Sequence, residues 1–198
     1  SPDKILAQYD NAVKLDPTFA LVWYAKGAVL YSNNRRDEAK QALLQARKLS
    51  DRLPMTLKVQ VDVYLAFIDY DYDKAVALLQ HWVKMTPADS TPMLMLASLY
   101  ASLNRTQEAN QAYRQLLEYN PDDLFALRAL ADSAAGAADY KQAMHISERL
   151  LALNPKDAAN VQRLIENQWN AGNFAQARAM LPKLELLDTK AAVDLKVS

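Results

Sequence analysis

Apolar residues recur along this chain at intervals of three and four positions, the spacing that places side chains on one face of an α-helix. Leu124, Leu127 and Leu130 show it in one segment, and Ile146 and Leu150 show it in another. Short polar stretches rich in asparagine and aspartate separate such segments, and these residues suit the corner between two helices. Glycine, which tight turns between strands favour, occurs only three times. The pattern predicts an all-α chain of paired helices.

Prolines divide this helical pattern at a nearly constant interval. Pro87, Pro121 and Pro155 are 34 residues apart, and Pro54 and Pro17 continue the series upstream at intervals of 33 and 37. Each is expected to end a helix, because proline lacks the amide hydrogen that continues the helical ladder. After each proline one small residue returns at a fixed place in the second helix: Ala39, Ala75, Ala109, Ala143 and Ala177. A period of this length predicts stacked two-helix repeats.

The repeat resembles the tetratricopeptide repeat (TPR). In that family a tryptophan, a leucine–glycine pair and a tyrosine mark the first helix, and alanine, an aromatic residue, alanine and proline mark the second. The matching residues in the first, third and fifth repeats are Trp23, Gly27, Ala39, Leu43 and Ala46; Leu96, Ala97, Tyr100, Ala109, Tyr113 and Pro121; and Leu164, Gly172, Phe174 and Ala177. The resemblance implies a right-handed α-α superhelix of about five repeats with partial terminal repeats, in which the first helices form the concave face.

The phase of the repeat sets the expected boundaries. We expect one solenoid domain over residues 1–198, with a half repeat at 1–17, repeats at 20–53, 56–87, 90–121, 124–155 and 158–189, and a partial capping helix at 190–198. Because the chain begins with serine rather than methionine, we also expect it to be a processed or excised part of a longer protein.

The second repeat departs most from the family pattern. Three extra residues, Asp51, Arg52 and Leu53, precede it, and Val63 stands in its glycine position. Its sequence is similar to TPR regions that follow bacterial serine/threonine kinase domains, adenylate cyclases or winged-helix transcription activators. That resemblance implies a place in a signalling or regulatory protein, but no residues of those other domains are present, so their activities are not implied.

Composition narrows the classes of partner. The chain has 23 basic and 23 acidic residues, which gives no indication of nucleic-acid binding. It has no cysteine, which excludes disulfides and thiolate metal sites. No apolar run reaches the length of a membrane span and no signal peptide opens the chain. We expect a cytoplasmic location, with the periplasm as the alternative.

One acidic turn has the alternating spacing that begins a calcium loop. Asp69, Asp71 and Asp73 form it, but the glycine and the bidentate glutamate of such a loop are replaced by Lys74 and Gln80. We therefore interpret the run as a polar turn that caps the following helix.

No residues form a pattern typical of catalysis. His81 and His145 lie in different repeats, and we expect both to be solvated or to serve packing. Neither a glycine-rich phosphate loop nor a nucleophile-elbow motif is present. We therefore expect a non-enzymatic protein without a cofactor.

Two opposite charges occupy equivalent positions in adjacent first helices. Lys26 and Asp62 stand where the family usually has leucine. One hypothesis is that they form an inter-repeat ion pair, and the alternative is that each side chain extends separately into solvent.

The residues expected on the concave face are aromatic and apolar in the first repeats and more polar in the later ones. The candidate ligand-binding residues are Tyr24, Tyr31, Gln60, Tyr64, Phe67, Met95, Phe125, Arg128, Arg163 and Trp169. Tyrosine, phenylalanine and methionine are favoured at protein interfaces, so this face is expected to bind an amphipathic helix or an extended peptide. The alternative is that these aromatics fill space between first helices or contact an intramolecular segment.

Chaperone-binding members of the family clamp a C-terminal carboxylate with lysine, arginine and asparagine on this face. The corresponding positions here are Tyr24, Ala28, Val61, Thr91 and Met95, so that activity is not implied.

Two functions therefore remain open. The first is an interaction module for a protein or peptide, acting as a scaffold or sensing arm of a larger bacterial protein. The alternative is a structural assembly factor of an envelope or secretion complex, acting through repeat-mediated oligomerisation such as a homodimer.

Overall fold

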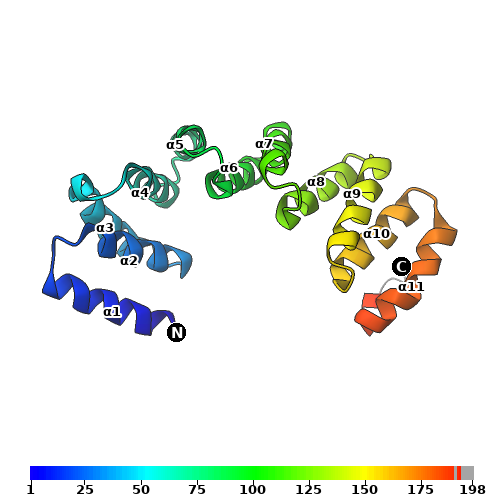
Figure 1. Ribbon diagram of the computed structural model, residues 1–198, viewed down its shortest axis with the longest axis horizontal. Coiled ribbons are helices and arrows are strands. Elements are labelled where there is room, and N and C mark those ends of the chain that lie inside the picture. The colour runs from blue at the N-terminus through cyan, green and yellow to red at the C-terminus, as the bar shows by residue number, and fades with distance from the viewer. Residues whose placement is uncertain (190, 193–198) are drawn as a thin grey trace. The chain divides into compact units, whose positions relative to one another are not determined.

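The computed structural model describes residues 1–189 and 191–192, and within them the chain is helical without strands (Figure 1). The helices are α1 (Pro2–Leu15), α2 (Ala20–Ser32), α3 (Arg36–Lys48), the 3₁₀ helix η1 (Ser50–Arg52), α4 (Met55–Ile68), α5 (Tyr72–Met85), α6 (Ser90–Ser102), α7 (Thr106–Tyr119), α8 (Leu124–Gly136), α9 (Tyr140–Leu153), α10 (Ala158–Asn170) and α11 (Phe174–Leu187). The predicted all-α class is confirmed. The expected capping helix at 190–198 lies almost wholly outside the described residues.

Helices pack as consecutive hairpins. Helix α2 contacts α3, α4 contacts α5, α8 contacts α9 and α10 contacts α11. The second helices α3, α7 and α9 also contact the first helices that follow them, α4, α8 and α10. Helix α1 packs on α2. The chain divides into two compact units, unit 1 (residues 1–99) and unit 2 (residues 100–198).

Each hairpin turns through one residue in the left-handed region. These residues are Asn34, Tyr70, Asn104, Ala138 and Gly172, with φ between 57° and 80°. The amide of the next residue donates to a carbonyl five positions earlier, as from Arg35 to Leu30 and from Asp139 to Ala134, both at 2.9 Å. This is the Schellman geometry that satisfies the last carbonyls of a helix. Glycine and asparagine adopt it readily, whereas tyrosine and alanine do so at a cost.

Aspartates begin several helices. Asp123 and Asp157 accept backbone amides at 2.9 Å at the starts of α8 and α10. Asp71 does the same for Lys74 at 3.2 Å at the start of α5, as predicted for the acidic turn, and Asp69 beside it forms an ion pair with Lys40.

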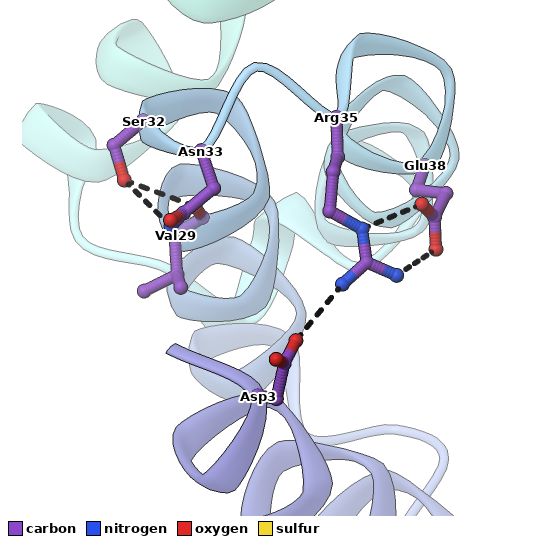
Figure 2. A network of polar contacts seen from close by, with 6 residues as sticks. All are labelled: Asp3, Val29, Ser32, Asn33, Arg35 and Glu38. Atoms are coloured by element: carbon purple, nitrogen blue, oxygen red, sulfur yellow. Dashed lines mark hydrogen bonds and ion pairs between the residues drawn. The ribbon is translucent and has the colours of Figure 1, made fainter. Parts of the chain in front are cut away.

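A polar network ties α1 to the first hairpin (Figure 2). The Arg35 guanidinium donates to both carboxylate oxygens of Glu38, at 2.7 and 2.6 Å, and a third nitrogen lies 3.6 Å from Asp3 of α1. Ser32 and Asn33 donate to the Val29 carbonyl at 2.9 and 2.7 Å, which closes the end of α2. Because these groups lie at the surface, the network positions α1 and adds little stability.

The helices of a hairpin approach closely at small residues. The recurring alanines are at most 3% exposed. At Gly27 an added Cβ would lie 2.6 Å from Cγ of the fully buried Leu43. Only glycine permits this approach, so the family's glycine position is explained by packing.

Candidate peptide-binding surface

The first helices of unit 1 bring four aromatic rings together. We call this set, Tyr24 and Tyr31 of α2 with Tyr64 and Phe67 of α4, the aromatic wall. The spacings of seven and three residues place each pair on one helix face. Ring centroids are 6.4 Å apart for Tyr24 and Tyr64, 5.2 Å for Tyr64 and Tyr31, and 6.4 Å for Tyr31 and Phe67. The rings therefore form a continuous series across two repeats.

Gln60 joins the aromatic wall through its side chain. The Tyr24 hydroxyl donates to the Gln60 carbonyl oxygen, linking α2 to α4. All four rings and Gln60 are partly exposed, so the wall belongs to the surface as well as to the helix contact. The rings pack on each other, and each keeps part of its surface exposed.

Burial raises the pKa of the tyrosines of the wall. Desolvation raises the pKa of Tyr24 to about 12, with a smaller contribution from the neighbouring Tyr64. Desolvation also raises the pKa of Tyr31 and of Tyr64. At physiological pH these phenols carry no charge, as is ordinary for tyrosine, and they can donate hydrogen bonds.

Ion pairs border the aromatic wall, but the hypothesis that joined Lys26 to Asp62 is wrong. Lys26 pairs instead with Asp10 of α1 at 2.5 Å, and Asp62 lies 3.9 Å from Arg47 of α3. Each first-helix charge thus reaches the second helix of the preceding repeat. That helix lies beside it in the stack, which explains the choice of partner.

Met95 is the remaining candidate of unit 1. It is partly exposed on α6, and no polar or ring contact joins it to the aromatic wall.

In unit 2 the candidate arginines are engaged within the protein. Arg128 of α8 forms an ion pair with Asp157 and approaches the Asn160 carbonyl oxygen at 3.4 Å, and Arg163 of α10 pairs with Asp132 of α8. Burial, and then the charge of Arg128, lower the pKa of Arg163. These residues link α8 and α10 in both directions, and we call them the α8–α10 clasp.

The two candidate aromatic residues of unit 2, Phe125 and Trp169, contact different neighbours. Phe125 packs on the buried Tyr113 at 6.1 Å. Trp169 meets Phe174 edge-on at 4.9 Å, and Arg178 lies 5.9 Å from its ring. Trp169 and Arg178 also line a hollow of about 330 Å³ between α10 and α11.

The described residues hold no group of three or more histidines or carboxylates arranged to bind a metal ion. His81 and His145 are both exposed. Among the described helices, none is long and apolar enough to span a bilayer.

Sequence comparison identifies the repeats. One tetratricopeptide repeat model matches residues 66–132 and another matches residues 20–51, which together amount to half of the chain. The chain belongs to the tetratricopeptide repeat family. TPR proteins are in general non-enzymatic modules for protein–protein interaction. No curated protein matches this TPR chain significantly by sequence.

Solved structures share the fold of this TPR protein. YrrB, described as a TPR protein with an unusual peptide-binding site, is 16% identical with a TM-score of 0.67, over 96% of this chain and 98% of YrrB. MamA from Desulfovibrio magneticus RS-1 is 15% identical with a TM-score of 0.68, over 86% and 96% of the two chains. A TPR protein from Parabacteroides merdae is 17% identical with a TM-score of 0.64, over 96% and 79%.

Sequence reasoning missed the carboxylate partner of Arg128. Asp157 caps the start of α10 and also has a second role. One of its carboxylate oxygens accepts a hydrogen bond from the Ala159 amide, and the other accepts one from Arg128. The sequence signal that could have predicted this ion pair is an acidic residue at the start of one first helix, together with an arginine on the first helix of the preceding repeat.

Proposed function

We propose that this TPR protein binds a peptide or helix of a partner protein on the aromatic wall. The observation that carries the proposal is the continuous series of four partly exposed rings, with no free charge among them. Aromatic side chains bury a large area with little loss of side-chain entropy, and they dominate binding energy at protein interfaces. The peptide-binding site for which YrrB is described lends support, because that protein shares the fold along nearly its whole length.

The same proposal covers the wider role. We propose that the chain is the scaffold or sensing arm of a larger bacterial signalling or regulatory protein. Support comes from the irregular second repeat, whose sequence is similar to TPR regions in such proteins. In the structure the extra residues Asp51 and Arg52 lie in η1, and Leu53, which follows it, is buried against the core of unit 1.

Selection from a random-peptide display library would test binding at the aromatic wall. Peptides enriched on the wild-type chain are expected to lose at least about tenfold in affinity for the Tyr64→Ala and Phe67→Ala variants, since buried aromatic anchors contribute over ~1 kcal/mol each. Tyr119→Ala is the matched control, because Tyr119 is an exposed tyrosine at the end of α7 in the other unit. Circular dichroism establishes that each variant is folded.

Equal binding of every selected peptide to wild type and to both wall variants would contradict the proposal. The assembly function makes a different prediction. A dimer that forms with rising concentration in sedimentation experiments, and that both wall variants abolish, would favour oligomerisation through these rings.

A further inference from the structure

Three hydrogen-bond donors on the aromatic wall have no partner among the residues that the structure describes. The hydroxyls of Tyr31 and Tyr64 form no hydrogen bond with described residues, and the Gln60 amide accepts from Tyr24 without donating. None of the three donor atoms is among the buried polar atoms that lack a partner, so all three reach solvent. The wall therefore combines apolar ring faces with free donors.

The charged groups around the wall are already engaged. Lys26 pairs with Asp10, Lys40 pairs with Asp69, and the Arg36 guanidinium lies over the Tyr70 ring at 4.9 Å. A charged segment laid on the wall would lose water, and it would have to compete with Asp10 and Asp69 for the two lysines. Charge complementarity therefore favours an uncharged partner.

The free donors distinguish an extended partner from a helical one. A helix uses its own carbonyls internally, so it would cover the three donors without satisfying them, and each unsatisfied donor carries a desolvation cost. A polyproline II segment has no internal hydrogen bonds, and its carbonyls need donors. Proline has no amide hydrogen, so such a segment asks for no acceptor in return.

From this complementarity we propose that the aromatic wall binds an uncharged, proline-rich segment in the polyproline II conformation. The inference rests on the proposed function and names the partner's chemistry. Proline rings pack on the faces of Tyr24, Tyr64, Tyr31 and Phe67, and the hydroxyls of Tyr31 and Tyr64 donate to the segment's carbonyls.

Titration of the whole chain with two capped, uncharged peptides tests the inference. One is a fluorescently labelled decaproline, and the other is an alanine- and leucine-rich helix former of equal length. Saturable binding of decaproline is expected, with weaker or no binding of the helix former. The double variant Tyr31→Phe/Tyr64→Phe keeps the rings and removes two donors, so it is expected to weaken decaproline binding about tenfold or more. Tyr119→Phe is the control and is expected to bind as wild type.

The outcomes separate this inference from the proposed function. If the helix former binds and decaproline does not, the partner class is wrong and binding at the wall stands. If decaproline binds equally to the wild type and to the double variant, the assigned donors are wrong. If decaproline fails and library selection also yields no wall-dependent peptide, both proposals are overturned.

Discussion

The two units use polar residues in opposite ways. The interior of unit 1 is apolar, and its first helices present the aromatic wall with free donors. Among its described residues, unit 2 buries the polar side chains of Ser147, Asn160, Asn167 and Gln168. Its first helices also carry the α8–α10 clasp, in which arginines and aspartates satisfy one another. One repeat pattern thus supports either a series of partly exposed aromatic rings or a polar network directed at neighbouring helices.

Equivalent positions make the contrast concrete. Four residues after the recurring alanine, unit 1 has Leu43 and unit 2 has Ser147, and both are fully buried. Leu43 packs directly beneath Gly27, whereas the Ser147 hydroxyl accepts a hydrogen bond at 3.0 Å from Asn167. A buried hydrogen-bonded pair restricts which side chains can pack together more strictly than an apolar contact does. The reason is that a buried donor without an acceptor costs free energy.

The largest expected effect is at Leu43. Leu43→Ala is expected to lower the free energy of unfolding by roughly 2–5 kcal/mol, since it leaves a cavity where α2 and α3 touch. Chemical denaturation measures the change. Gln41→Ala on the same helix is the control, because Gln41 is exposed and should change stability little. A loss at Leu43 below about 1 kcal/mol would contradict the close packing described here.

A smaller effect is expected from the polar pair of unit 2. Ser147→Ala leaves the Asn167 amide without its acceptor and is expected to cost about 1–3 kcal/mol in unfolding free energy. Adding Asn167→Leu removes the orphaned donor and is expected to recover part of that loss. Additive losses in the double-mutant cycle would show that the two side chains are not coupled.

The turn residues should change stability by about 1 kcal/mol, in opposite directions. Gly172→Ala is expected to destabilise, because φ is +80° there, and Ala138→Gly is expected to stabilise, because alanine already adopts φ +58°. Thermal unfolding of both variants measures this. Gly136→Ala is the control without a positive φ and with no atom near an added Cβ, so it is expected to stabilise slightly. A stabilised Gly172→Ala variant would contradict the assigned turn.

The last prediction concerns only the aromatic wall, and no change in stability is expected at neutral pH. The folded-state pKa of Tyr24 is about 12 against an ordinary value of 10.0, so its contribution to stability is complete below pH 10.0 and is lost as pH rises toward about 12. Tyrosinate absorbance should contain a late step that Tyr24→Phe removes. If the titrations of wild type and variant differ only by a tyrosine of ordinary pKa, Tyr24 is not desolvated.

Much of the local structure followed from sequence because it depends on short-range chemistry. Proline ends helices through its missing amide hydrogen, the recurring alanines and Gly27 allow close approach, and the acidic turn caps α5 through Asp71. The helical period also placed Tyr24, Tyr31, Tyr64 and Phe67 on corresponding faces. Their mutual contacts agree with that placement, and their role in binding stays a prediction.

The partners of charged side chains were decided by tertiary structure. A period along the chain states which face a residue occupies, but not which neighbouring helix its side chain reaches. Lys26 therefore forms an ion pair with Asp10 rather than with Asp62, and Arg128 forms one with Asp157. A long charged side chain can reach several carboxylates, and its distance to each of them is set only when the helices pack.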